Sequence, residues 1–265
     1  MKAFFSLFWV ICFANLFAQK FNLKDSVVLD VPGTINDFAV DDFNNIYFIR
    51  NNTELNKIDY STKTRKTFSN QTILENLNTQ NILQITLKSA FFNLIVLDNQ
   101  LNLVQDPIQF PIETNFSPTL TALVDNNFLW GYDPVLQRLV LWNYREKKAI
   151  RQSVLLSERT ADEFFPELIY HQNRIYLISY SKCLVFDEYA NLIAVIPFQE
   201  FEQLQFLSDK IYFTKGKDLF QYDINTKSFD KVELPFEFEY FSINNRFLFV
   251  LNNKVVYLYQ LQKEY

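Results

Sequence analysis

The sequence predicts an all-β fold, a six-bladed β-propeller, and three observations favour it. First, a polar turn followed by a short apolar strand recurs six times, with 48, 34, 47, 36 and 36 residues between successive starts. That spacing suits four-stranded blades. Second, apolar and polar residues alternate around the repeats, as in antiparallel strands. Third, 29 Phe and 14 Tyr stand against only 3 Gly, a composition that favours strands. The six units begin at Asn45, Asn93, Asn127, Arg174, Lys210 and Arg246.

The first residues read as a secretory signal peptide rather than as part of the fold. Lys2 supplies the positive charge, and residues 3–13 are apolar apart from Ser6. This run is too short for a membrane-spanning helix, and small residues follow it, so we expect cleavage after Ala18. An uncleaved amphipathic anchor is the alternative. We therefore divide the chain into a signal peptide, 1–18, and one propeller domain, 19–265, that does not span the membrane.

Charge and cysteine content exclude several classes of protein. The net charge of −5 argues against a nucleic-acid partner, which needs a basic surface. After cleavage Cys183 is the one remaining cysteine, so no intrachain disulfide can form. It lies in the apolar run 183–186, which predicts a buried, inert thiol.

Blades one and five show the strand pattern most clearly. In each, an Asp ends the third strand and is expected to accept hydrogen bonds from the amides of the following turn, in the near-identical segments Asp59–Lys63 and Asp223–Lys227. The strands expected in blade one are 34–40, 46–50, 54–60 and a fourth ending near 68, and those in blade five include 210–214 and 218–223.

The other blades follow the same plan with two exceptions. Blade two is the least regular, because Pro107 and Pro111 interrupt its outer part. Blade six lacks a fourth strand, which we expect the N-terminal segment 25–31 to supply, closing the ring. A β-sandwich is the alternative architecture. The expected spans are 82–110 for blade two, 119–155 for blade three, 168–198 for blade four and 236–261 for blade six, with 68–81 and 157–165 as long connections.

A repeated acidic–aromatic pair is the main candidate for a binding site. Three Glu-Phe pairs recur at intervals of 37 residues, and each is expected to open the innermost strand of its blade, so that the carboxylates converge at one mouth of the channel. Such a rim could bind a divalent cation such as calcium, or a basic peptide. The alternatives are solvated strand starts that share an ancestral duplication, and rings that serve inter-blade packing. The candidate rim comprises Asp37, Glu163, Phe164, Glu200, Phe201, Glu202, Glu237, Phe238 and Glu239.

No catalytic signature appears in the sequence. The one histidine, His171, lies in a predicted turn, and we find neither a nucleophile elbow nor a glycine-rich phosphate loop. We therefore predict a non-enzymatic protein with no cofactor. Two alternatives stay open: a metal-dependent hydrolase or lactonase that uses the acidic rim, and a carbohydrate-binding module that uses the aromatic rings of the rim, although glycan platforms prefer Trp and the mature chain keeps just Trp130 and Trp142.

The segment Phe38–Phe48 resembles the turn–strand unit of NHL-like and TolB-like six-bladed propellers. Asn44 occupies the turn position where NHL blades usually carry Gly. The resemblance implies an interaction scaffold and carries over no functional residue. The bias toward Asn, Lys, Ile and Phe resembles exported proteins of the Bacteroidota. There, small periplasmic propellers can act as accessory or plug subunits of outer-membrane complexes such as the type IX secretion translocon. We thus expect a periplasmic, protein-binding propeller at the inner face of the outer membrane.

Overall fold

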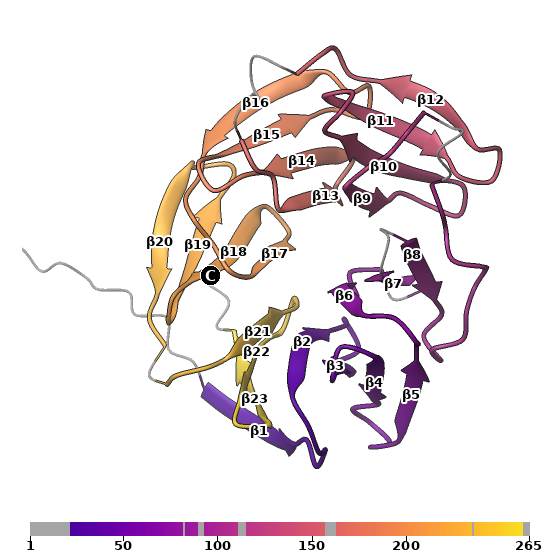
Figure 1. The fold of residues 1–265 in the computed structure, drawn as a ribbon. Helices are drawn as coiled ribbons and strands as arrows, with labels where there is room; N and C mark the ends of the chain where they lie inside the picture. Colours follow the sequence, from indigo (N-terminus) through magenta and orange to yellow (C-terminus); the bar gives the residue numbers. More distant parts are fainter. Residues whose placement is uncertain are drawn as a thin grey trace, which may run out of the picture.

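The computed structural model describes residues 22–81, 83–89, 93–110, 115–156, 163–234 and 236–261. Six antiparallel sheets surround a central axis, which confirms the predicted all-β six-bladed propeller (Figure 1). These residues include no helix long and apolar enough to cross a membrane. The predicted signal peptide and its cleavage point lie outside the described residues.

Each sheet runs from an innermost strand at the axis to an outermost strand at the circumference. Blade one comprises β2 (Ile35–Val40), β3 (Ile46–Arg50), β4 (Glu54–Ile58) and β5 (Arg65–Ser69), and blade two comprises β6 (Leu74–Asn78), β7 (Ile85–Ser89) and β8 (Asn93–Leu97). Blade three comprises β9 (Leu120–Leu123), β10 (Phe128–Asp133), β11 (Arg138–Asn143) and β12 (Lys148–Gln152), and blade four comprises β13 (Glu167–His171), β14 (Arg174–Ile178), β15 (Lys182–Phe186) and β16 (Leu192–Pro197).

The last two blades complete the ring. Blade five comprises β17 (Leu204–Leu207), β18 (Lys210–Lys215), β19 (Asp218–Asp223) and β20 (Ser228–Val232). Blade six comprises β21 (Tyr240–Ile243), β22 (Phe247–Asn252) and β23 (Val255–Gln260), and β1 (Asn22–Val28) pairs antiparallel with β23 as the fourth strand of this sheet.

Blade two departs from the sequence prediction. Its innermost strand, β6, lies within 68–81, which we expected to be a connection. The repeat unit at Asn93 is consequently the third strand, whereas the other five units form second strands. Only one side chain of β6 is fully buried, so the strand carries little apolar pattern, and its pairing with β7 shifts register between Glu75 and Asn78. Beyond β8, isolated bridges join Leu94 to Ile108 and Leu97 to Leu103 in place of a regular outer strand.

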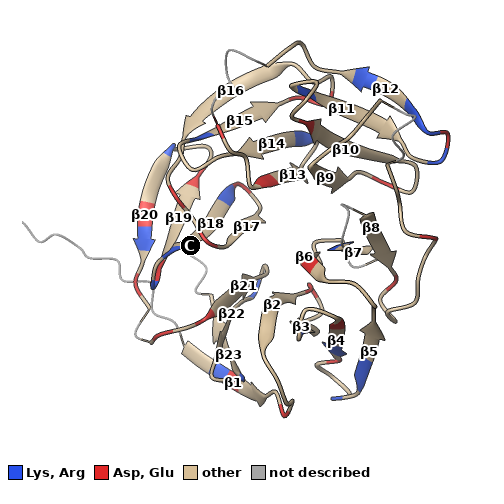
Figure 2. Ribbon diagram, in the orientation of Figure 1, with Lys and Arg blue, Asp and Glu red and all other residues tan. Residues whose placement is uncertain are grey.

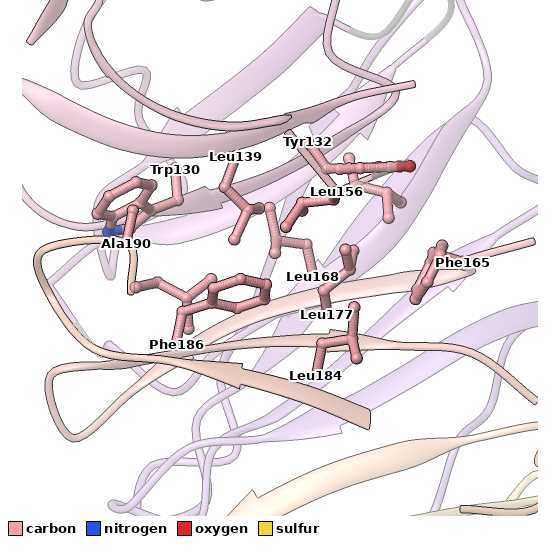
Figure 3. Packing of buried hydrophobic residues seen from close by; sticks show 12 residues of the cluster. Trp130, Tyr132, Leu139, Leu156, Phe165, Leu168, Leu177, Leu184, Phe186 and Ala190 are labelled. Atoms are coloured by element: carbon pink, nitrogen blue, oxygen red, sulfur yellow. The ribbon is translucent and has the colours of Figure 1, made fainter. Parts of the chain in front are cut away.

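The hydrophobic core is divided into clusters, one between each pair of neighbouring blades. Figure 3 shows the cluster between blades three and four, where Trp130 and Leu139 face Phe186 and Leu177. Second strands are buried on both faces, which explains why their repeat units are continuously apolar. Much of the aromatic surplus is therefore used in packing between blades.

Asp and Asn side chains shape the turns. The Asp59 and Asp223 carboxylates each accept two turn amides, at 2.8 to 3.0 Å, as predicted. The residues that end these turns, Lys63 and Lys227, have φ near +60°, a conformation that favours Gly. The Asp hydrogen bonds thus hold a left-handed backbone in a chain with few glycines.

The innermost strands run in the same direction along the axis. In blades one and two, Asp37 contacts Leu77 and the carbonyl of Val40 contacts Thr79. In blades five and six, Gln203 contacts Phe241 and Gln205 contacts Ile243, again in parallel order. The propeller thus has two distinct ends: the strand-start end, where innermost strands begin, and the hairpin end, where each turns into its second strand.

Candidate functional site

A cavity of about 610 Å³ lies at the centre of the propeller. The innermost strands of all six blades contribute to its wall, and Thr86, Lys88 and Leu94 extend it between blades two and three. Most of the side chains that reach it are amides, hydroxyls or charged groups. A volume of this size is typical of small-ligand sites.

Side chains partly close the cavity toward the hairpin end. A smaller cavity of about 260 Å³ lies beyond, and Gln80, His171 and Gln205 contact both. Gln80 Nε2 lies 3.4 Å from the carbonyl oxygen of Phe206, on the opposite blade. His171 Nε2 lies 2.8 Å from the carbonyl oxygen of Ser208. His171 ends β13 and lines the cavities, although the sequence suggested a turn.

Two glutamines join the innermost strands of blades five and six. Gln205 Oε1 accepts the amide of Ile243 at 2.9 Å, and its Nε2 donates to the carbonyl of the same residue at 2.7 Å. Gln203 likewise accepts the amide of Phe241 and donates to the carbonyl of Glu239. Each glutamine side chain satisfies backbone groups on an unpaired strand edge. Sequence analysis did not identify this role.

Three half-buried charged side chains line the cavity. Asp37 lies on β2, Lys88 on β7 and Glu167 at the start of β13. Figure 2 shows where acidic and basic residues lie along the strands of the propeller. Burial raises the pKa of Asp37 to about 6, against the opposing effect of hydrogen bonds from the amides of Leu77 and Phe38. Burial also raises the pKa of Glu167 and lowers that of Lys88, and their mutual attraction opposes both shifts. The sequence analysis named Asp37 alone of these three.

The predicted rim residues do not form one cluster. Asp37 and Glu202 line the cavity. The Glu-Phe pairs precede the innermost strands rather than open them, since β13 begins at Glu167, β17 at Leu204 and β21 at Tyr240. In the part of the chain that the structure describes, no three His, Cys, Asp or Glu side chains lie close enough together to hold a metal ion.

Ion pairs hold two rim carboxylates, Glu163 within its own blade and Glu237 to the neighbouring blade. Glu163 accepts hydrogen bonds from the hydroxyls of Ser179 and Ser181 and lies 2.9 Å from Lys182 Nζ, and these contacts lower its pKa to about 2. Glu237 pairs with Lys217 at 2.6 Å on the surface.

The remaining carboxylates and the three aromatic rings of the predicted rim differ in how far they are exposed to solvent. Glu202 and Glu239 accept the amides of Gly216 and Asn253 in the adjacent hairpins, while Glu200 is exposed. Phe201 is buried between blades four and five, and Phe238 packs against the cluster between blades five and six. Phe164 alone among the three rings is strongly exposed.

Exposed apolar side chains gather at the strand-start end of blades three and four. Leu156 and Phe165 are buried in the cluster between these blades (Figure 3). The residues that precede them, Leu155 and Phe164, are exposed. The Leu156 amide donates to Gln137 in the β10–β11 hairpin, and Phe164 packs against Tyr180 in the β14–β15 hairpin. We call this group the blade 3–4 patch; it comprises Val135, Leu136, Val154, Leu155, Phe164 and Tyr180.

The predicted buried thiol is confirmed. Cys183 is inaccessible to solvent between blades four and five, and burial raises its pKa well above the ordinary range. A neutral thiol in an apolar cluster is a weak nucleophile.

No protein-family model and no curated protein matches the sequence. Several solved structures share the fold. BamB from Moraxella catarrhalis matches with a TM-score of 0.52 and 9% identity, over 93% of this chain and 99% of the BamB chain. Streptogramin B lyase matches with a TM-score of 0.58 and 12% identity, over 92% of this chain and 88% of the lyase chain. A chain of the mitotic checkpoint complex matches with a TM-score of 0.59 and 6% identity, over 92% of this chain and 95% of that chain. At these identities the likeness establishes the propeller fold alone.

Proposed function

We propose that this protein is a non-catalytic propeller that binds another protein through the blade 3–4 patch. The single observation that carries the proposal is the exposure of two aromatic rings, Phe164 and Tyr180, that pack against each other at the surface. Phe164 is 68% exposed and Tyr180 is 45% exposed, and their ring centroids lie 6.2 Å apart. Contiguous apolar groups left in water are typical of interaction surfaces.

The surroundings of the patch also fit a protein interface. The Glu163–Lys182 ion pair lies beside Phe164 and Tyr180, so charged groups border the exposed rings. Aromatic residues at the centre and polar groups at the edge are the usual anatomy of protein interfaces. Both hairpins that carry the patch are anchored to the core, so the surface is preformed and loses little entropy on binding.

We place this interaction in the periplasm of a Bacteroidota-type cell. The N-terminal sequence supports export through a cleaved signal peptide of residues 1–18, leaving 19–265 as one domain. The pairing of β1 with β23 supports closure of the ring by the N-terminal strand. The extracellular domain of BT4673 from B. thetaiotaomicron has a similar propeller fold, with a TM-score of 0.53 and 11% identity. The match covers 87% of this chain and 35% of the BT4673 chain. The proposed partner is an outer-membrane protein, with this chain as an accessory or plug subunit of a complex such as the type IX secretion translocon.

Capture from the native envelope tests the proposal. The tagged mature protein would be incubated with envelope extract in mild detergent, and the bound proteins would be measured by quantitative mass spectrometry. We expect one outer-membrane protein in stoichiometric amount, lost with Phe164→Ser. The matched control is Phe43→Ser, because Phe43 is 67% exposed in the β2–β3 hairpin at the hairpin end. Equal capture by both variants would exclude the patch as the interface.

Calcium separates the interaction module from the hydrolase alternative. A ligand that binds only the native state raises the melting temperature. We expect no shift with calcium, since no described group of acidic residues is placed to coordinate it. A calcium-dependent rise that Glu200→Gln with Glu237→Gln abolishes would instead support a metal site at the rim. Retention on polysaccharide columns would support the carbohydrate-binding alternative.

A further inference from the structure

The central cavity holds charges that the interaction surface does not use. Lys88 projects into it from the second strand of blade two, where the register shift in β6 and the extension between blades two and three leave room for its side chain. Residues on the second strand of a blade usually pack between blades, as Leu87 does here. The position of Lys88 on the cavity wall is therefore specific to this blade.

The charge of Lys88 has no close partner. Within the described ranges, its ammonium makes no hydrogen bond, and no carboxylate lies within ion-pair distance of it. Its pKa is lowered by burial, and the attraction to Glu167 and Glu75 offsets part of that shift. A half-buried ammonium without a hydrogen-bond acceptor is costly, because distant carboxylates compensate just part of the hydration that it has lost.

Glu167 is similarly under-satisfied on the facing wall. The one hydrogen bond it receives among the described residues comes from Asn76 Nδ2 at 3.5 Å, the outer limit for such a contact. The Glu167 carboxylate and the Lys88 ammonium attract each other, but they lie farther apart than ion-pair distance. The cavity thus holds two opposite charges that attract each other but do not form an ion pair.

We infer that the central cavity binds a small zwitterion of the α-amino-acid class, with the ligand carboxylate on Lys88 and the ligand ammonium on Glu167. Such a ligand gives each half-buried charge a partner. The site therefore offers one cationic and one anionic group to a molecule that carries both complementary charges. Hydrogen bonds between charged partners are the strongest available in such a site.

The charge of the wall disfavours other ligand classes. The carboxylates of Asp37, Glu167 and Glu202 outnumber the ammonium of Lys88 on this wall, so a simple anion would be repelled by three carboxylates. A simple cation would be repelled by Lys88 and would leave the Lys88 ammonium without a partner. A neutral sugar would leave both charges without a counter-charge. Asp37 already accepts two backbone amides, and its role is to add negative potential on the side of the ligand ammonium.

Calorimetric titration of the wild-type protein tests this inference without any substitution. The common free L-amino acids would first be screened by their effect on the melting temperature. The best of them would then be compared with its N-acetyl derivative, which lacks the ammonium, its amide, which lacks the carboxylate, and glucose. We expect the free amino acid to bind, and both derivatives to bind at least about tenfold more weakly, since each loses one charged hydrogen bond.

Variants locate the binding site. Lys88→Met should weaken binding of the free amino acid at least about tenfold, whereas Lys217→Met, which changes a surface lysine paired with Glu237, should leave it unchanged. Glu167→Gln should abolish the preference for the free amino acid over its N-acetyl derivative. Phe164→Ser should not affect binding, so failure of the proposed interface and failure of this site are distinguishable. The inference would be overturned if no amino acid binds, if both derivatives bind equally well, if glucose binds instead, or if folded Lys88→Met binds normally.

Discussion

Asp37 Oδ2 accepts a hydrogen bond of 2.9 Å from the backbone amide of Leu77, 40 residues further along the chain and in the next blade. The other carboxylate oxygen accepts the amide of Phe38. One side chain therefore joins the innermost strands of blades one and two beside the cavity. It does so at an electrostatic cost, because burial raises its pKa to about 6.

The raised pKa of Asp37 predicts a pH-dependent stability. Protonation is favoured more strongly in the folded than in the unfolded state, where the pKa is near 3.8. The stabilisation it provides is therefore complete below about pH 4 and is lost as the pH rises through about 6. We expect the stability of wild type relative to Asp37→Asn to fall between these values. Urea unfolding at intervals of pH measures the difference, and parallel curves would contradict the shift.

Gln205 should be important for stability even though it lies in a polar cavity. Gln205→Ala removes the partner of both backbone groups of Ile243 and leaves them at an unpaired strand edge. We expect a loss of about 1–3 kcal/mol in the free energy of unfolding. Gln152→Ala is the control, since Gln152 is exposed on outer strand β12 and contacts only the Arg138 side chain. Equal effects in chemical denaturation would show that the inter-strand bonds contribute nothing.

The hydrogen bonds and the ion pair around Glu163 predict a stability that depends on pH in the opposite direction, so that it falls as the pH falls. Hydrogen bonds from Ser179 and Ser181 and the ion pair with Lys182 lower the pKa of Glu163 to about 2. The stabilisation is present above its ordinary pKa, near 4.5, and is lost as the pH falls toward 2. We expect Glu163→Gln to cost about 1–2 kcal/mol at pH 7, allowing for partial solvent screening, and nothing near pH 2.

The exposed Glu200 offers a matched control for Glu163. Glu200→Gln should leave the unfolding free energy within experimental error at both pH values. Thermal or urea unfolding of the two variants side by side makes the comparison. If both variants behave alike, the interactions around Glu163 do not stabilise the fold.

A turn substitution should instead increase stability. Lys227 has φ of +58° and is exposed at the end of the Asp223 turn. Gly adopts this conformation without the steric cost that other residues carry. We expect Lys227→Gly to raise the free energy of unfolding by up to about 1 kcal/mol, whereas Lys231→Gly, in strand β20, should lower it. A destabilised Lys227→Gly would mean that the Asp223 hydrogen bonds already remove the strain.

The local features of the fold were predictable from the sequence. Second strands are buried on both faces, so units such as 46–49 and 175–178 are apolar throughout and could be recognised wherever they recur. Asp59 and Asp223 interact with amides two and three residues away, so their turns too are encoded within a few residues. Strand β6 was missed because Asn76 and Asn78 line the polar cavity and Glu75 is exposed, so the strand carries few apolar side chains.

The acidic rim shows where sequence periodicity misleads. A 37-residue spacing places Glu163, Glu200 and Glu237 at equivalent positions of successive blades, but equivalence by rotation keeps them apart around the ring. Glu163 pairs with Lys182 of its own blade, Glu200 is exposed to solvent, and Glu237 pairs with Lys217 of the neighbouring blade five. A repeated residue therefore does not by itself predict a shared site.

The sequence by itself determined the number of blades, the turns and the strands outside blade two, because these depend on the alternation of side chains and on contacts within a hairpin. Only the tertiary structure brought Lys88 and Glu167 to one cavity and set Gln205 against Ile243. The reason is geometric. Residues that meet at the axis belong to different blades, so their separation along the chain carries no signal, and the closure of the ring decides which of them face each other.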